Sequence, residues 1–216
     1  MKHYEAYLFD WDGTLAQSHD MWLSIMHRQL RRHNITVSDG QIVKQLFGRY
    51  EEGLREFGFS EVEIKALTKE LQTIAKQQFP LVDLFPGAQD VLNTLRQQGK
   101  KVALVTASYR DVINVAVGNH KLLDFFDIII TGDEMKAQKP DPSGLLLVLE
   151  KLKIAPSRAI MIGDSPKDLL AGNNAGTDTL LFYPPEHESQ HPLSELQSCK
   201  PTYTIHSWQE FFDRLQ

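Results

Sequence analysis

Two aspartates that follow the first apolar run are the residues best placed to do chemistry. The run from Ala6 to Phe9 ends at Asp10, and Asp12 and Gly13 come directly afterwards. Side chains two residues apart lie on the same side of an extended backbone, and a glycine permits a sharp turn next to them. The pattern predicts a buried strand that carries two carboxylates to the edge of a sheet, where ligands bind in open α/β folds.

Two later apolar runs also end in polar residues. The run Val102 to Val105 is followed by Thr106-Ala107-Ser108, and the run Ile160 to Ile162 by Gly163-Asp164-Ser165, with Asp168 at an expected helix start. If the three runs are neighbouring parallel strands, their carboxyl ends meet at one edge of the sheet. We therefore expect these hydroxyls and carboxylates to lie beside Asp10 and Asp12.

A single lysine completes this set. Lys139 precedes Pro140 in a stiff, turn-rich stretch between the second and third of these strands. Several carboxylates without histidine or cysteine among them favour a hard, oxygen-liganded cation, most simply Mg²⁺. A hydroxyl and an ammonium would complete a phosphate pocket, where the cation offsets the repulsion between an anionic nucleophile and a phosphate. The residues alone do not separate the nucleophile from the metal ligands.

The elements between these strands predict the fold class. Further short apolar runs occur at 128–130 and 180–182, and amphipathic segments at 88–98 and 143–153. The runs lack alternation, which is typical of strands covered on both faces. Strand–helix alternation of this kind predicts an α/β fold with a doubly wound, Rossmann-like parallel sheet.

One region interrupts the alternation. Residues 16–81 contain no convincing strand, but they have helical patterns at 20–32, 38–47 and 51–57 and a capping box at Ser60 that opens a longer helix. We expect an all-helical domain over 16–81, inserted into a core domain made of 1–15 and 82–216. The segment from 184 to about 201 is expected to be a polar loop with solvated histidines, including His187 and His191.

Composition excludes several classes of protein. The chain has 216 residues, a formal net charge of −5 and one cysteine, Cys199. The acidic balance argues against non-specific nucleic-acid binding, and there is no apolar run of membrane-spanning length. One cysteine forms no internal disulfide, so a reduced, cytoplasmic setting is expected. We expect a small phosphorylated metabolite as partner, no nucleic acid, no membrane, and a monomer or weak homodimer.

These segments together resemble a known superfamily. The stretches beginning at Asp10, Val105, Lys139 and Gly163 are similar to the four motifs of the haloacid dehalogenase-like (HAD) superfamily. The helical insert resembles the cap domain of its phosphoglycolate phosphatase and β-phosphoglucomutase branch. The resemblance covers nearly the whole chain.

The resemblance implies a role for each residue. Asp10 would attack phosphorus and form an aspartyl-phosphate, and Asp12 would act as general acid and then general base. Asp168 would orient Lys139 or a metal-bound water. The remaining roles are phosphate binding by Thr106, Ala107 and Lys139, and Mg²⁺ binding by Asp10, the Asp12 backbone carbonyl and Asp164.

The resulting functional prediction is a Mg²⁺-dependent phosphatase for a small phosphorylated metabolite, either phosphoglycolate-like or a sugar phosphate. Two alternatives remain open: a phosphomutase of the β-phosphoglucomutase type, and a non-catalytic sensor of a phospho-ligand. Arg49, in an expected turn between two helices of the insert, is a candidate for recognising the leaving group.

Overall fold

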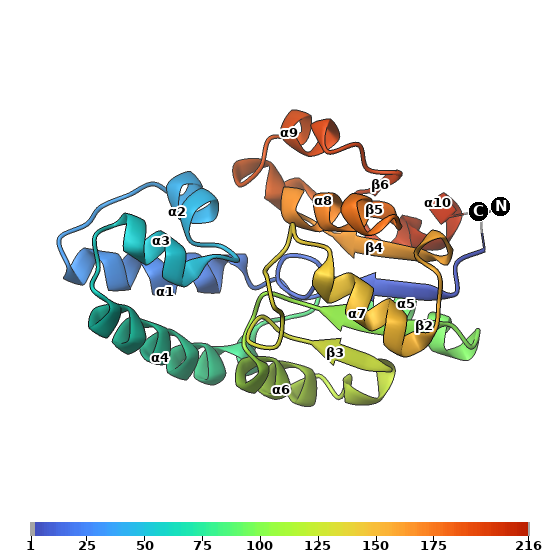
Figure 1. Cartoon of the computed structure of the whole chain (residues 1–216), viewed down its shortest axis with the longest axis horizontal. Helices are drawn as coiled ribbons and strands as arrows, with labels where there is room; N and C mark the ends of the chain where they lie inside the picture. Colours follow the sequence, from blue (N-terminus) through green and yellow to red (C-terminus); the bar gives the residue numbers. More distant parts are fainter. Residues whose placement is uncertain (1–2, 216) are drawn as a thin grey trace.

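Six parallel strands form one sheet at the centre of the molecule (Figure 1). The computed structural model describes residues 3–215, apart from the side chain of Ser189. The strands, in the spatial order β3-β2-β1-β4-β5-β6, are β1 (Ala6–Phe9), β2 (Lys101–Val105), β3 (Ile128–Ile130), β4 (Ala159–Gly163), β5 (Asp178–Phe182) and β6 (Tyr203–Ile205). The predicted α/β class and parallel sheet are confirmed. The edge strand β6 was not predicted, because its three residues are too few for an apolar pattern to be recognised.

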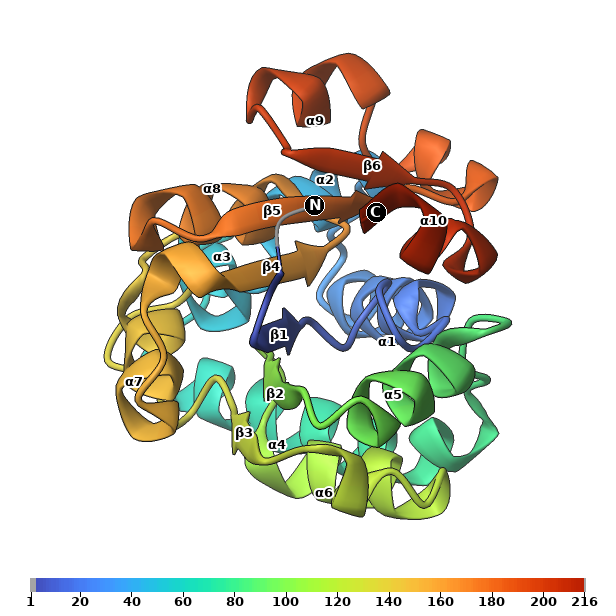
Figure 2. The same ribbon diagram turned by 90° about the vertical axis from the view of Figure 1, so that its right-hand side faces the viewer.

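Helices cover both faces of the sheet (Figure 2). On one face lie α5 (Ala88–Gln97), α6 (Arg110–Asn119) and α10 (Phe211–Leu215), and on the other α7 (Ser143–Leu152) and α8 (Pro166–Ala175). Within β1, Tyr7 and Phe9 pack on the first side, whereas Ala6 and Leu8 pack on the second. Burial on both faces explains why the strands read as continuous apolar runs. Within residues 3–215, no helix has both the length and the apolar character needed to cross a membrane.

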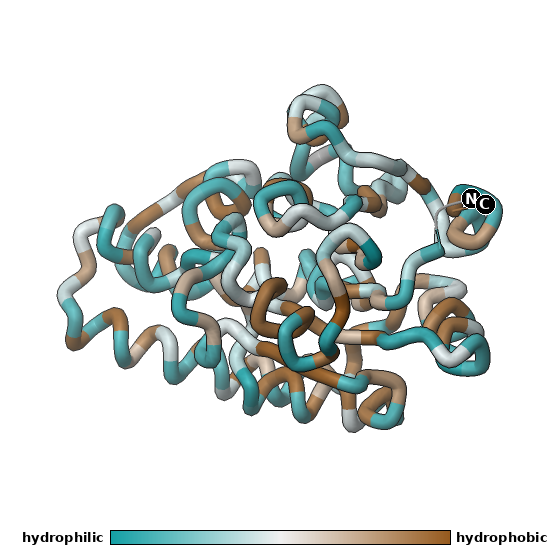
Figure 3. Tube along the Cα trace, turned by 45° about the vertical axis from the view of Figure 1, so that its right-hand side comes forward, coloured by the Kyte–Doolittle hydropathy of each residue, from teal (hydrophilic) through white to brown (hydrophobic). Residues whose placement is uncertain are grey.

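Four helices lie beyond the carboxyl ends of the strands, at the left of Figure 1. They are α1 (His19–Arg32), α2 (Asp39–Gln45), α3 (Tyr50–Glu56) and α4 (Glu61–Gln78). The predicted capping box is present: Ser60 accepts from the Glu63 backbone, and the Glu63 side chain accepts from the Ser60 backbone. Hydrophobic and hydrophilic residues alternate along these helices in Figure 3, as amphipathic helices that pack on one another require.

The two chain segments that join these helices to the sheet run side by side. Ala16 and Leu84 form an antiparallel bridge, the Gln17 N–H donates to the Asp83 carbonyl at 2.9 Å, and the Phe85 N–H donates to the Leu15 carbonyl at 2.9 Å. The helical segment is thus connected to the sheet through one narrow, paired crossing, which begins beside the predicted boundaries at 15/16 and 81/82.

The segment after β5 differs from its prediction. Instead of a continuous loop, it contains a 3₁₀ helix (Pro185–Ser189) and α9 (Leu193–Ser198). The His187 side chain is only 3% exposed, and its ring packs against Phe85 and Phe182. The expectation of a solvated histidine was wrong here because the apolar rings that cover it come from distant parts of the chain. Three further 3₁₀ turns are Phe79–Leu81, Leu123–Phe125 and Pro156–Arg158, and a fourth, Trp208–Glu210, precedes α10.

Candidate active site

The sheet register brings the predicted polar residues to one edge. Phe9 of β1 pairs with Leu104 of β2 and with Ile162 of β4, and the Asp10 N–H donates to the Ile162 carbonyl at 2.9 Å. The residues that follow each strand are therefore level with one another. Asp10 and Asp164 come together in this way although Asp164 lies 154 residues after Asp10 in the chain.

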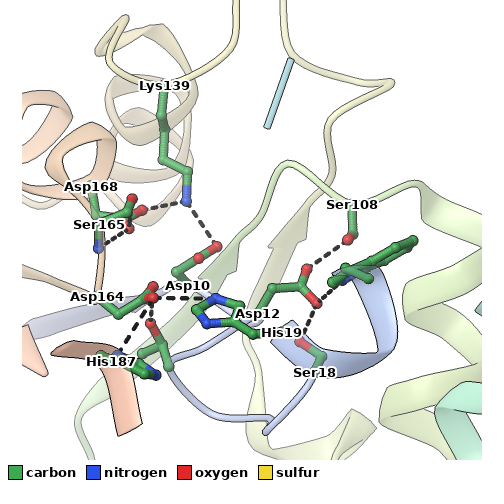
Figure 4. Close-up of polar contacts among 12 residues, drawn as sticks. Asp10, Asp12, Ser18, His19, Ser108, Lys139, Asp164, Ser165, Asp168 and His187 are labelled. Carbon is green, nitrogen blue, oxygen red and sulfur yellow. Dashed lines mark hydrogen bonds and ion pairs between the residues drawn. The ribbon is translucent and has the colours of Figure 1, made fainter. Parts of the chain in front are cut away.

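Lys139 lies between two aspartates (Figure 4). Its Nζ donates to Asp10 Oδ1 at 2.8 Å, to Asp168 Oδ1 at 2.6 Å and to the Val105 carbonyl at 2.9 Å. Burial opposes its ionisation, but the charges of Asp10 and Asp168 outweigh burial and raise the pKa of Lys139 above its ordinary value. The ammonium is therefore a fixed cation at the edge of the sheet.

Asp168 is itself held by the start of α8. Its Oδ2 accepts from the Ser165 hydroxyl at 2.6 Å and from the Ser165 backbone N–H at 3.2 Å, which forms a capping box at this helix. Because its other oxygen binds Lys139, Asp168 connects the first turn of α8 to the lysine. This geometry fits the orienting role expected for it.

Three carboxylates gather at this edge, and Lys139 contacts two of them. Oxygens of Asp10, Asp164 and Asp168 lie within 4.8 Å of one another, and all three residues are buried. Burial raises the pKa of Asp10 to about 7 in spite of Lys139, and burial together with the charges of Asp168 and Asp10 raises the pKa of Asp164 well above its usual range. Such excess negative charge fits an oxygen-liganded divalent cation, so the residues present suit Mg²⁺.

Asp12 is held by three donors. The Ser18 hydroxyl and the Trp22 indole N–H each donate to Oδ1 at 2.6 Å, and the Ser108 hydroxyl donates to Oδ2 at 2.6 Å. Ser108 was among the hydroxyls expected at this edge, but Ser18 and Trp22 were not singled out, because Trp22 reads in sequence as an apolar helix residue. The carboxylate is consequently fixed between α1 and the loop after β2.

A cavity of about 790 Å³ lies between this edge and the helices α2 and α3. Asp10, Asp12, Lys139 and Asp164 line it, as does Ala107. Thr106 is fully buried and is not among the lining residues. Its Oγ1 instead accepts from the Ser108 N–H at 3.1 Å, so in this structure it shapes the loop that carries Ala107.

Arg49 and Lys167 are two of the cations that line the cavity in addition to Lys139. Arg49 precedes α3, and its guanidinium donates to Glu52 at 3.2 Å and to Glu56 at 2.5 Å. Lys167, at the start of α8, donates to the Phe47 carbonyl. Lys167 was not predicted as a site residue, although it belongs to the stretch that begins at Gly163.

Two histidines approach Asp164. His19 Nε2 lies 3.3 Å and His187 Nδ1 3.8 Å from Asp164 Oδ2. Burial lowers the pKa of His19 to about 4 and that of His187 to about 3, so both rings are neutral at pH 7. Gly13, with a φ of 75°, makes room for His19, because a Cβ there would lie 2.2 Å from the His19 ring.

Comparison with known proteins agrees with this geometry. The sequence model of the family described as "Haloacid dehalogenase-like hydrolase" matches residues 7–182. Pyrophosphatase PpaX of Bacillus thuringiensis (strain Al Hakam) is 30% identical over 180 residues, which cover 80% of each chain. A Clostridium perfringens protein described as "Putative pyrophosphatase PpaX" is 29% identical over 221 residues, covering 98% of this chain and 97% of its own length.

A solved structure is similar over nearly the same span. It is described as "Putative haloacid dehalogenase-like hydrolase", comes from Bacteroides fragilis, and is 29% identical with a TM-score of 0.85. The match covers 96% of this chain and 99% of the other. The similarity therefore includes the helices α1–α4 as well as the sheet.

Proposed function

Because the chain belongs to the haloacid dehalogenase-like hydrolases and is a phosphatase of that family, we propose that it is a Mg²⁺-dependent enzyme acting on a small phosphorylated substrate. The observation that carries the proposal is the contact of Lys139 with both Asp10 and Asp168 at the edge of the 790 Å³ cavity. It leaves Asp10 buried, oriented and facing the space where a phosphoryl group would lie. The alternative of a non-catalytic sensor does not fit the phosphatase relatives.

We propose that Asp10 is the nucleophile. Its free carboxylate oxygen attacks phosphorus, the bond from phosphorus to the leaving oxygen breaks, and Asp12 donates a proton to that oxygen. A water then attacks the aspartyl-phosphate and gives its proton to Asp12, which releases phosphate and regenerates Asp10. The three donors on Asp12 keep its carboxyl group at a fixed position through both steps.

The remaining site residues bind and orient. Lys139 and the loop of Thr106 and Ala107 would hold the phosphoryl oxygens, and Asp168 would keep Lys139 in place. Asp10, the Asp12 backbone carbonyl and Asp164 would hold Mg²⁺, which supplies positive charge next to the reacting phosphate.

We further propose that residues 16–81 act as a cap over the site, with 1–15 and 82–216 as the core domain. The paired crossing at Ala16 and Leu84 would be the hinge, and the contact of Lys167 with Phe47 would hold the closed position. Closure excludes bulk water from the reacting phosphate.

The substrate class follows from the cations that line the cavity. Lys167 and Arg49 lie on its lining together with Lys139, so a substrate with a second anionic group would be favoured over a neutral ester. Pyrophosphate satisfies this condition, and relatives of this chain are named pyrophosphatases. Arg49 would contribute only after leaving Glu52 and Glu56.

The experiment is a hydrolysis assay on the purified chain. Phosphate release from pyrophosphate, phosphoglycolate, several sugar phosphates and p-nitrophenyl phosphate is measured with Mg²⁺, with excess EDTA, and after Mg²⁺ is restored. We expect Mg²⁺-dependent turnover that EDTA removes reversibly, and the highest kcat/KM for pyrophosphate. Full activity in EDTA would contradict the metal assignment, and conversion of a hexose phosphate to its isomer without phosphate release would favour the phosphomutase alternative.

A further inference from the structure

Two buried histidines that the proposed phosphatase chemistry does not use form a cluster with Asp164. His19 Nε2 and His187 Nδ1 lie 3.3 Å and 3.8 Å from the same oxygen of Asp164, and the three ligand atoms lie within 4.8 Å of one another. Figure 4 shows both imidazoles next to Asp164, whereas Lys139 contacts Asp10 and Asp168. The three residues come from the start of α1, the end of β4 and the 3₁₀ helix after β5.

His187 has an unsatisfied ring nitrogen. The residue is 3% exposed, and its Nδ1 has no hydrogen-bond partner among the described residues. The rings of Phe85 and Phe182, with centroids 5.7 Å and 6.1 Å away, cover it. Buried polar atoms almost always have a hydrogen-bond partner or another ligand. An unpartnered nitrogen that faces Asp164 therefore indicates a site where a bound ligand would contact His187 Nδ1.

The types of atom in this cluster, and the distances between them, indicate which kind of ion would bind. Two imidazole nitrogens with one carboxylate oxygen are typical of Zn²⁺ and related transition-metal ions, whereas Mg²⁺ prefers oxygen alone. Tetrahedral bonds of 2.0–2.1 Å place neighbouring ligand atoms about 3.4 Å apart. The distances of 3.3 Å and 3.8 Å from Asp164 Oδ2 lie on either side of that value.

We propose that His19, Asp164 and His187 bind a divalent transition-metal ion such as Zn²⁺, at a position separate from the oxygen-liganded Mg²⁺. His19 also lines the cavity, which gives the ion an entry route and a water as fourth ligand. Asp164 belongs to both clusters, so the two cations are neighbours that share one carboxylate.

Gly13 is a requirement of this arrangement. A Cβ at position 13 would lie 2.2 Å from His19 Nε2 and 2.4 Å from Asp164 Oδ2. Any other residue there would displace these two metal-binding atoms. It would also strain the backbone, whose φ is 75°.

The test is metal binding by the full chain, measured without turnover. The wild type, His187→Asn and the control His33→Asn, which changes an exposed histidine of the helical segment, are dialysed against graded Zn²⁺ in millimolar Mg²⁺. Bound zinc is then counted by mass spectrometry. We expect one Zn²⁺ per chain in the wild type and in His33→Asn, and binding weaker by about 100-fold in His187→Asn.

A second variant tests whether a loss of zinc in His187→Asn comes from altered packing or from the missing metal ligand. His19→Asn removes the other imidazole and keeps His187, whose ring contacts Phe85 and Phe182, and we expect the same loss of zinc. Co²⁺ bound in place of Zn²⁺ should give a visible absorption band in the wild type that both variants lose. Equal zinc affinity in the wild type and both variants, or no zinc bound by the wild type in Mg²⁺, would overturn the proposal and leave the proposed phosphatase mechanism untouched.

Discussion

The indole nitrogen of Trp22 donates a 2.6 Å hydrogen bond to Asp12 Oδ1. This bond connects α1, which belongs to the helical segment, to the loop after β1, which belongs to the sheet. Ser18 donates to the same oxygen at 2.6 Å. Asp12 therefore has its full set of donors only when α1 is in the position seen here, so the proposed general acid is assembled by closure of the proposed cap.

Removing donors from Asp12 should slow the chemical step. In Trp22→Phe and Ser108→Ala the carboxylate loses one hydrogen bond each, and a bond to a charged group contributes about 1.5–3 kcal/mol. We expect kcat to fall about tenfold or more with little change in KM. The matched control is Ser143→Ala, because the Ser143 hydroxyl has no hydrogen-bond partner in the described chain. A wild-type kcat in both Asp12-directed variants would mean that the orientation of Asp12 does not limit the reaction.

Asp10→Asn should abolish turnover and leave the fold intact. The amide keeps the shape of the side chain but is not a nucleophile, so we expect kcat to fall by a factor of ~10³ or more. Phosphate release and the melting temperature are measured beside Asp90→Asn, which changes an exposed aspartate of α5. Substantial activity in Asp10→Asn would assign the nucleophile to another residue.

Lys139→Met should destabilise the protein, because Asp10 and Asp168 then lose the cation that they contact. Removing one partner of a buried ion pair leaves uncompensated charge, at a cost of about 3–5 kcal/mol. We expect a loss of this order in the free energy of unfolding, measured with urea in EDTA at pH 7.5. Adding Asp168→Asn to Lys139→Met should restore part of it, since one of the stranded carboxylates is then neutral. The free energy of unfolding is also measured for Asp168→Asn alone. If Asp168→Asn lowers it by the same amount in Lys139→Met as in the wild type, the two residues act independently.

Lys167 and Arg49, which both line the cavity, should differ in their effect on pyrophosphate hydrolysis. Lys167 contacts a backbone carbonyl, whereas Arg49 is held by two glutamates. We expect Lys167→Met to raise KM about tenfold, as for the loss of one charge-assisted hydrogen bond. We expect Arg49→Ala to raise it only about threefold, because Arg49 must first leave Glu52 and Glu56. The KM for p-nitrophenyl phosphate, which has no second anionic group, serves as the control. An unchanged kcat/KM for pyrophosphate in Arg49→Ala would remove Arg49 from the site.

The buried carboxylates should make the metal-free protein less stable as the pH rises. The pKa of Asp10 is raised to about 7 and that of Asp164 is raised well above its usual range, so the folded state binds more protons than the unfolded state between pH 4 and 7. Stability therefore falls with rising pH, by up to about 1.4 kcal/mol per pH unit for each group. His19 and His187 act in the opposite direction near pH 6.5, because burial lowers their pKa values and the unfolded histidines then bind more protons than the folded ones. Comparing the wild type with Asp10→Asn cancels this contribution, since both proteins keep the two histidines.

We expect the melting temperature of the wild type in EDTA to fall from pH 6.5 to 8 relative to that of Asp10→Asn, and Mg²⁺ to raise the wild-type value more at pH 8 than at pH 6.5. A difference between the two melting temperatures that does not change across this window would contradict the assignment of a raised pKa to Asp10.

The strand pattern allowed much of the site to be predicted. Asp10 and Asp164 each follow a run of buried residues, and parallel strands with buried faces bring their carboxyl ends to one edge. The positions of β1 and β3 agree residue for residue with the apolar runs, and β2, β4 and β5 begin one or two residues earlier. The helices of the insert were found for a similar reason, since amphipathic spacing and the Ser60 capping box are local signals.

Other parts of the site have no local signal. Trp22 looks like a core residue of α1 until its nitrogen is seen to face Asp12, and His187 looks like a loop residue until Phe85 and Phe182 are seen to cover it. Lys139 lies 29 residues from Asp168 and 129 from Asp10, and no periodicity in the chain specifies that its ammonium lies between them.

The amino-acid sequence thus determined which residues end each strand and which helices form, because burial and backbone preference act over a few neighbouring positions. Only the tertiary structure decided the partners of those residues: the donors on Asp12, the two aspartates on Lys139, and the two histidines on Asp164. Such contacts depend on how the helices and the segment after β5 pack over the edge of the sheet, and that packing is a property of the whole chain.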